Sequence, residues 1–246
     1  MPFPVAPDWR ELKTMALRCL AHIHTRFSFD SWLSPHKILA RARRSGADVL
    51  IVTDHNTILG SAEVHRLAQG NPRFTVIAAE YKTEKGDVIG LFLKAEITAR
   101  QSGEVMDEIH KQGGLVLLPH PYKGHKLDDE LLAKVDLIET FNARCSSEEN
   151  AKAEELSRTL NKPGLAGCDA HCAPELQAVV NEFEAVAATE HDLRRSLLTS
   201  PRRIQIQPVS RIYQPYSQMI KACKTRDARL FLSQIKRMAF LVTEGA

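Results

Sequence analysis

Short apolar runs of strand length alternate with segments of helical periodicity along most of this chain. Eight runs have the length and composition of buried strands: Ala16–Ala21, Val49–Val52, Phe74–Ala79, Val88–Leu93, Leu115–Leu118, Leu137–Phe141, Gly164–Cys168 and Glu182–Val186. Six segments have the spacing and end signals of helices: Ser34–Ser45, Ile58–Gln69, Ser102–Gln112, Asp128–Lys134, Ser147–Asn161 and His191–Leu198. Because helical segments separate most of the strands, the pattern predicts an α/β fold of parallel strands joined by crossover helices.

The sequence after the first strand and near the end of the chain makes the predicted fold more specific. No glycine-rich dinucleotide-binding loop follows the first strand, so a closed or nearly closed barrel is favoured over an open doubly wound sheet. After about Gln207 the alternation stops, and two helical segments follow: Ser217–Lys224 and Arg226–Val242. We expect a single domain with a barrel over about residues 15–206 and a helical C-terminal tail over about 207–246 that packs on the barrel exterior.

The composition is ordinary for a globular protein. Of the 246 residues, 43% are hydrophobic and 26% are charged. No stretch approaches the roughly 20 apolar residues that cross a bilayer, so no membrane partner is expected. The first residues lack a signal-peptide pattern and the five cysteines are irregularly spaced, so we expect a cytoplasmic protein. The net charge of +3 is too small to indicate nucleic acid.

Side chains that can bind metal follow the predicted strands. His22 and His24 end the first strand and, two residues apart, point to the same side of it. A pair of hydrogen-bonded core histidines would show the same spacing, so the other strand ends decide between the two interpretations. Those ends carry further candidates: Asp30, Asp54, His55, Glu80, His120, Cys145, Asp169 and His171. Barrels and open α/β sheets gather their chemistry at this edge, and five of the ten histidines lie there.

These residue types predict a centre with more than one metal ion. Mixed imidazole and carboxylate ligands suit Zn, Mn or Fe better than Ca or Mg. Nine donors are too many for one tetrahedral ion and fit two or three divalent ions that share a carboxylate. Closely spaced ions stabilise both oxygens of a displacement at phosphorus and favour a hydroxide as the nucleophile, so the sequence predicts phosphoester hydrolysis. Hydrolysis of a C–N bond, as in amides or amidines, is the closest alternative.

Three of the candidates allow a second interpretation. Glu80 follows a wholly apolar run, where an unpaired carboxylate would be costly, so a cation partner is favoured. Cys145 is either a ligand or a free buried thiol, with Asn142 or a carbonyl serving in its place. Asp54 faces away from His55 by strand alternation, so it either orients a ligand imidazole by a hydrogen bond or caps the helix that begins near Ile58.

The order of these motifs resembles the polymerase and histidinol phosphatase (PHP) family over about residues 17–186. The resemblance rests on His22-Ile23-His24-Thr25 with Ser28 and Asp30, Thr53-Asp54-His55-Asn56, Glu80, Leu118-Pro119-His120-Pro121, Cys145 and Gly167-Cys168-Asp169-Ala170-His171. It implies a distorted, seven-stranded (β/α) TIM-like barrel with a trinuclear metal centre. It further implies three ligand sets: His22, His24, Glu80 and Asp169; Glu80, His120 and Cys145; and Asp30, His55 and His171.

A phosphate substrate would need catalytic and anchoring groups beside the metals. His55 or His171 could assist proton transfer, although both are also expected ligands. Arg144 is the preferred phosphate clamp, because a guanidinium matches phosphate oxygens in a bidentate way. Arg26 and the Ser28 hydroxyl are further candidates, with a solvated surface arginine as the alternative for Arg26.

The substrate itself is predicted only by class. About 40 residues separate Glu80 from His120, which leaves no room for the lid domain of relatives that resemble nucleoside bisphosphate phosphatases, so we expect an open site. The aromatic content of 6% gives no obvious platform for stacked bases, so a small phosphorylated substrate is favoured. An exonuclease-type activity on nucleic-acid ends and a non-enzymatic, metal-stabilised module stay open as alternatives. The oligomeric state is not predicted.

Overall fold

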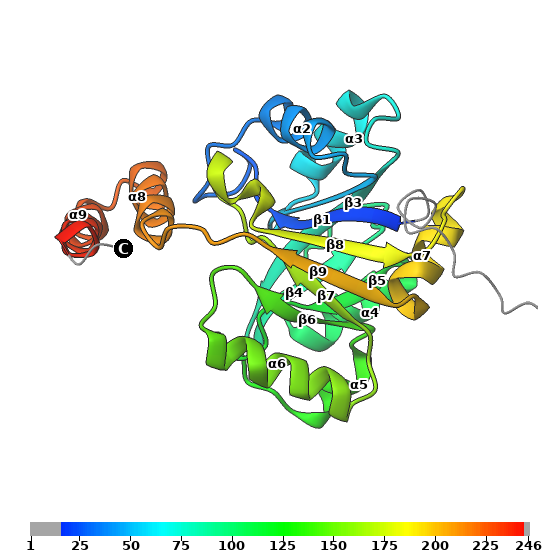
Figure 1. The fold of residues 1–246 in the computed structure, drawn as a ribbon. Helices are drawn as coiled ribbons and strands as arrows, with labels where there is room; N and C mark the ends of the chain where they lie inside the picture. The colour runs from blue at the N-terminus through cyan, green and yellow to red at the C-terminus, as the bar shows by residue number, and fades with distance from the viewer. Residues whose placement is uncertain (1–15, 244–246) are drawn as a thin grey trace, which may run out of the picture.

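The structure, a computed structural model, describes residues 16–243. Its strands form one nine-stranded sheet in the order β7-β6-β5-β4-β3-β2-β1-β8-β9 (Figure 1). The strands are β1 (Ala16–Ile23), β2 (Val49–His55), β3 (Phe74–Thr83), β4 (Gly86–Leu91), β5 (Leu115–Leu118), β6 (Leu137–Asn142), β7 (Gly164–Gly167), β8 (Val179–Glu184) and β9 (Arg202–Ile206). All eight predicted strands are present, and β9 is an addition.

Strands β1 to β7 curl into a nearly closed barrel. The N-terminal half of β1 pairs with β8, from Ala16 to Cys19, whereas its C-terminal end meets the segment that follows β7. That contact includes an Ile23–Ala170 bridge and a hydrogen bond of 2.9 Å from the Cys168 amide to the Ala21 carbonyl oxygen. The predicted class, a distorted (β/α)7 barrel with a helical C-terminal tail, is therefore confirmed. The closure also brings the ends of β1 and β7 together.

The strand directions differ from the prediction in two places. β4 runs antiparallel to both β3 and β5, because a tight turn at Thr83–Gly86 joins β3 directly to β4 without a crossover helix. Gly86 has a φ of +120°, a conformation that favours glycine. β8 and β9 form a second antiparallel extension beside β1. β9 was not predicted, because this edge strand is mostly exposed and lacks an apolar run.

Helices surround the barrel close to the predicted positions. They are α2 (Pro35–Arg44), α3 (Leu59–Ala68), α4 (Ser102–Lys111), α5 (Asp129–Lys134), α6 (Ser147–Thr159) and α7 (Glu190–Thr199), with a 3-10 helix η2 (Ala173–Gln177). Side chains of β1 alternate between two layers: Cys19 and Ala21 face one core cluster, and Leu20 packs with Ile38 of α2 in another. The alternation leaves the carboxyl ends of the strands free to carry polar side chains.

The tail forms a helical hairpin that touches the barrel at its mouth. It consists of α8 (Tyr213–Thr225) and α9 (Ala228–Thr243), which project from the barrel in Figure 1. Lys224 Nζ donates to the carbonyl oxygens of Arg26, Ser28 and Ser31 in the loop after β1, at 2.6 to 2.8 Å. No side chain of α9 is buried. Among residues 16–243, no helix is both long and apolar enough to cross a membrane.

Candidate metal centre

Eight of the nine predicted ligands converge at the carboxyl-terminal mouth of the barrel. They come from the ends of five strands and the loop after β1: His22, His24, Asp30, His55, Glu80, His120, Asp169 and His171. Seven of these side chains are buried, and that of His55 is partly exposed. The parallel pairing of β2 with β3 brings His55 directly beside Glu80. Barrel closure adds Asp169 and His171 next to β1.

Glu80 lies at the centre of the cluster. One carboxylate oxygen lies 3.1 Å from His120 Nε2 and 3.5 Å from His22 Nε2. The other lies 3.1 Å from His55 Nδ1 and 3.5 Å from His24 Nε2. A single carboxylate that faces four imidazoles has the arrangement of a ligand shared between ions.

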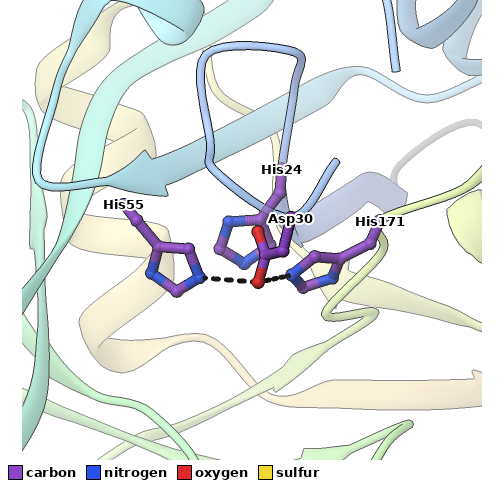
Figure 2. Close-up of side chains that lie close together, drawn as sticks. All are labelled: His24, Asp30, His55 and His171. Atoms are coloured by element: carbon purple, nitrogen blue, oxygen red, sulfur yellow. Dashed lines mark ion pairs between the residues drawn. The ribbon is translucent and has the colours of Figure 1, made fainter. Parts of the chain in front are cut away.

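A second group of side chains surrounds Asp30, as Figure 2 shows. One Asp30 oxygen lies 3.1 Å from His171 Nε2 and 3.4 Å from His55 Nε2. The ring of His24 lies between these two, with its centroid 4.1 Å from that of His171 and 4.5 Å from that of His55. His24, Asp30, His55 and His171 each offer one donor atom within 4.8 Å of the others, which is close enough for one ion.

Several buried polar atoms in the cluster have no hydrogen-bond partner among the described residues. They are His22 Nε2, His24 Nε2, Asp30 Oδ1 and Glu80 Oε2. The opposite ring nitrogens are occupied, since His22 Nδ1 lies 2.7 Å from Glu139 and His24 Nδ1 lies 3.2 Å from the Ser28 hydroxyl. Those contacts favour tautomers whose Nε2 lone pairs point into the cluster. Leaving such atoms unpaired would be costly, so the residues fit a bound cation.

Three of the candidate ligands have strained backbones. His22, His120 and Asp169 have φ angles of 59°, 27° and 47°, in the left-handed region that side-chain-bearing residues rarely adopt. Such conformations cost about 1–3 kcal/mol each, and surrounding contacts must hold them. Their concentration at one mouth of the barrel is typical of a functional site.

Glu139, which was not among the predicted site residues, contacts two candidate ligands from within β6. Its Oε1 accepts from His22 Nδ1, and its Oε2 accepts from the His120 amide at 2.8 Å and Asn142 Nδ2 at 2.9 Å. The side chain is buried. A Cβ on Gly167 would overlap Glu139 Oε1, so glycine is required there. Glu139 therefore fixes two ligand positions at once.

We expect Glu139→Gln to weaken metal binding about 10- to 100-fold. The amide oxygen can still accept from His22, but its NH₂ group would face the two donors that now bind Oε2. Titration calorimetry with Zn or Mn measures the effect, and Glu104→Gln on the exposed side of α4 is the control. Unchanged affinity in Glu139→Gln would contradict this role.

Charges within the centre shift the pKa values of its histidines in opposite directions. Burial lowers the pKa of His24 to about 3, helped by the nearby His171 and His55. Burial also acts on His55, but the Glu80 and Asp30 carboxylates outweigh it and raise its pKa to about 9. The pKa of His22 is likewise raised: burial opposes the shift, and Glu139, Asp169 and Glu80 drive it. Without a metal, protons on His22 and His55 balance the carboxylates.

Metal binding at pH 7 is therefore expected to release protons. His55, with its pKa raised to about 9, is protonated at pH 7 in the metal-free protein and must lose that proton to become a ligand. Affinity should accordingly rise with pH up to about 9, by about tenfold per pH unit for one proton. Calorimetry in buffers of different ionisation enthalpy counts the protons. Affinity that falls between pH 7 and 9 would contradict the expectation.

Asp54 acts on the centre through the loop after β1. It accepts hydrogen bonds from the Thr25 amide (2.6 Å), the Thr25 hydroxyl (2.7 Å) and the Ser28 hydroxyl (2.7 Å). The contact with a ligand imidazole thus runs through Ser28, which bonds His24 Nδ1, rather than directly. The alternative helix cap is wrong, because the residue at that position is Ile58, which makes no side-chain cap.

The residues predicted to bind phosphate already have partners in the structure. Ser28 is buried, and its hydroxyl joins Asp54, His24 and the His55 amide. Arg26 pairs with Glu63 on α3 at 3.0 Å, as the surface alternative predicts. A phosphate clamp at either position would have to replace these contacts.

Arg144 is also engaged, in a buried ion pair that sequence analysis did not foresee. Its Nε and Nη2 donate to the two oxygens of Glu175 at 2.9 Å, and its Nη1 donates to Ser217 of α8 at 2.9 Å. Glu175 Oε2 also accepts from the amide of His171 at 2.9 Å. Arg144 therefore connects the end of β6 to the Asp169–His171 loop, through Glu175, and to α8, through Ser217. These contacts argue against the predicted role as a phosphate clamp.

Cys145 does not join the cluster, and Asp87 does. No described group of potential ligands includes Cys145, whose burial raises its thiol pKa to about 12. Instead, Asp87 of β4 offers an oxygen within 4.8 Å of donors on Glu80 and His120. Burial, followed by the charge of Glu80, raises the pKa of Asp87. Alternation along β4 could not have identified it, because the antiparallel direction of that strand was not predicted.

Comparisons with known proteins identify relatives of this chain. Residues 147–199 match the model of a PHP-associated family, over α6 to α7. An uncharacterized protein of Methanocaldococcus jannaschii is 38% identical over 136 residues, which cover 50% of this chain and 80% of that protein.

Two solved structures share the fold. One is a two-domain protein from Bacteroides vulgatus, described as containing a predicted PHP-like metal-dependent phosphoesterase (17% identity, TM-score 0.66). It covers 78% of this chain, and this chain spans 65% of it. The other is a lesion-specific endonuclease from Pyrococcus furiosus (17% identity, TM-score 0.57), which covers 77% of this chain and of which this chain spans 58%. This chain thus corresponds to part of each protein.

Proposed function

We propose that the chain is a metal-dependent hydrolase of phosphoesters of the polymerase and histidinol phosphatase (PHP) family, whose associated family model matches residues 147–199 and whose fold a solved PHP-like protein shares. The observation that carries the proposal is a set of buried donor atoms on His22, His24 and Glu80 that have no hydrogen-bond partner within residues 16–243 and point into one cluster at the barrel mouth. Bound divalent ions would supply an activated water and neutralise charge on the phosphate. The protein would supply their positions and the exclusion of bulk water.

Two or three ions of Zn, Mn or Fe would share the donors. Asp30, His55 and His171 would hold one ion, with His24 beside them. His22, His24, Glu80 and Asp169 would hold another. We assign Asp87, in place of Cys145, to a third position with Glu80 and His120.

Removing Asp87 is expected to lower the number of bound ions by one, because the position would retain only two protein ligands. Metal content by mass spectrometry after dialysis against Zn or Mn measures this in Asp87→Ala and Cys145→Ala. We expect a full complement in Cys145→Ala and one ion fewer in Asp87→Ala. The reverse result would restore Cys145 as the ligand.

His55 is the better placed of the two candidates for proton transfer. Its side chain is the more exposed of the two, whereas His171 is buried and its Nδ1 is held by the Asp169 carbonyl oxygen at 2.9 Å. His55 stacks on Phe29 with a centroid distance of 4.5 Å, which fixes the plane of its ring. We assign His55 a role in moving a proton near the mouth, and Asp54 a positioning role through Ser28.

The experiment is a panel of phosphate monoesters and diesters, with amides included to test C–N hydrolysis. Each substrate is assayed with added Mn, Zn or Fe(II) and with a chelator. We expect turnover of at least one class of phosphoester that depends on metal. Turnover of amides alone would favour the C–N hydrolase, and a protein that binds metal but hydrolyses nothing in the panel would favour the non-enzymatic module.

A further inference from the structure

The C-terminal hairpin carries a concentrated positive charge. Residues 209–243 contain seven lysines and arginines and one acidic residue, Asp227, for a net charge of +6. The whole chain has a net charge of +3, so the other residues together carry −3. The hairpin itself carries the exposed cations Arg226, Arg229, Lys236 and Arg237 besides Lys224, whose ammonium binds carbonyl oxygens, and the exposed Arg211 lies just before α8. Such an uneven distribution is typical of a surface that binds a polyanion.

The hairpin is fixed at the mouth that holds the metal centre. At one end of α8, Gln214 Nε2 donates to the Arg144 carbonyl oxygen at 2.9 Å, at the exit of β6. At the other end, Lys224 binds three carbonyl oxygens of the loop that carries Asp30. Between them, Lys221 Nζ lies 4.9 Å from the centroid of Phe29, whose ring stacks on His55. The helix α8 therefore lies along the rim, and α9 extends the basic surface outward (Figure 1).

Exposed aromatic side chains gather on the same rim. Phe27 and Trp32, 37% and 54% exposed, lie in the loop after β1. Tyr122, 39% exposed, follows β5, and Tyr216, 38% exposed, lies on α8. The only other largely exposed aromatic residue among those described is Phe240, on α9. The low overall aromatic content thus conceals a local concentration at the mouth.

We propose that the rim and the hairpin bind a single-stranded polynucleotide, whose phosphates contact the basic hairpin and whose bases stack on Trp32 and its aromatic neighbours. Cations that follow a backbone, combined with exposed rings, are the general means of holding single strands. The inference rests on the proposed function, because the bound strand would present a phosphoester to the metal centre. It changes the expected substrate from a small molecule to a nucleic acid.

An anionic membrane is the main competitor for this surface. Exposed aliphatic residues on α9, among them Leu232, Ile235 and Val242, would suit a lipid interface. Of the exposed aromatic residues, however, Phe27 and Trp32 follow β1, Tyr122 follows β5 and Tyr216 lies on α8, and Phe240 is the one on α9 among the described residues. A polynucleotide accounts for both the charge and the position of the rings, whereas a membrane accounts for the charge and the aliphatic residues of α9.

Two triple variants with the same net charge test the hairpin. The first is Arg229→Gln/Lys236→Gln/Arg237→Gln on α9. The control, Arg44→Gln/Arg66→Gln/Lys111→Gln, removes three exposed charges near the C-terminal ends of α2, α3 and α4, at the end of the barrel opposite the mouth. Binding of a fluorescein-labelled 15-nucleotide single strand, as DNA and as RNA, is followed by anisotropy without added metal, over a range of salt concentrations.

We expect the α9 variant to bind about 10- to 100-fold more weakly than the wild type at low salt. The slope of log K against log salt should also fall by about 2, since each lost phosphate contact removes about 0.7. The control variant should retain wild-type affinity. Equal losses in both variants, or no binding by the wild type, would overturn the proposal. So would α9-dependent binding to vesicles of anionic phospholipid without binding to the oligonucleotide.

A second pair of variants tests the rim. Trp32→Ala should weaken binding at least about fivefold through lost stacking, while Val186→Ala, an exposed residue after β8, should not. Equal affinity of the Trp32→Ala and Val186→Ala variants for the oligonucleotide would contradict stacking on Trp32. Because binding is measured without turnover, it is independent of the phosphoester panel. Failure of the panel contradicts the proposed hydrolase, and failure of binding contradicts only the polynucleotide.

Discussion

His24→Ala should reduce metal-dependent phosphoester hydrolysis by at least about 10³-fold, which corresponds to about 4 kcal/mol of lost transition-state stabilisation. His24 belongs to both ligand sets proposed for the first two ions: it stands between His55 and His171, and its Nε2 lies 3.5 Å from Glu80 and from Asp169. Its removal therefore disturbs two metal positions at once. Steady-state kinetics with saturating Mn or Zn, together with metal analysis of the purified protein, measures both consequences.

The control for His24→Ala is His36→Ala, an exposed histidine on α2 outside the cluster. It should retain wild-type activity and metal content. Ser28→Ala tests whether the orientation of the His24 ring matters in addition to its presence. The variant keeps His24 but removes the hydroxyl that accepts from His24 Nδ1, so an intermediate loss of metal affinity is expected. Full activity in His24→Ala would remove the basis for the metal-dependent hydrolase.

The site could be predicted from the sequence where a ligand ends a strand. His22, His24, His55, Glu80 and Asp169 follow apolar runs, and the carboxyl ends of barrel strands meet at one mouth, so local pattern was enough to bring them together. The same reasoning is weaker for Cys145, which lies three residues past the end of β6 and outside every donor group among residues 16–243. The path of the turn after β6 depends on tertiary contacts, so spacing along the chain does not by itself place this side chain.

Residues that support the ligands were harder to predict. Glu139 lies in the middle of a strand that otherwise reads as apolar, and the argument applied to Glu80, that a buried carboxylate needs a partner, would have identified it. Asp87 depended on β4 running antiparallel. The partner of Arg144 is 31 residues away, across β7. A guanidinium that looks available for phosphate in the sequence can therefore be fully engaged within the fold.

The tail illustrates a different limit. Its two helices were predicted from periodicity, with α8 beginning at Tyr213 rather than at Ser217. Their position at the mouth depends on a few long-range contacts, such as those of Lys224 and Gln214, that no local pattern reveals. Averages over the whole chain, a net charge of +3 and 6% aromatic residues, likewise hid the charge of the hairpin and the rings of the rim.

Arg144→Ala should lower the free energy of unfolding by about 3–5 kcal/mol, because it leaves the carboxylate of Glu175 buried without its partner. The two side chains are only 8% and 4% exposed, and the pair is bidentate. Arg26→Ala, by contrast, breaks a surface pair with Glu63 and should cost less than about 1 kcal/mol. Urea denaturation followed by circular dichroism measures both values.

The double variant Arg144→Met/Glu175→Leu distinguishes two roles for Arg144, a structural ion pair and a phosphate clamp. Removing both charges should recover part of the stability lost in Arg144→Ala, because no unpaired charge stays buried. A phosphate clamp would behave differently: Arg144→Ala would unfold like the wild type and raise KM for the phosphoester alone. Because Glu175 also holds the His171 amide, loss of the pair should loosen the Asp169–His171 loop and lower metal affinity along with stability. Arg144 would then act on catalysis by keeping two ligands in place.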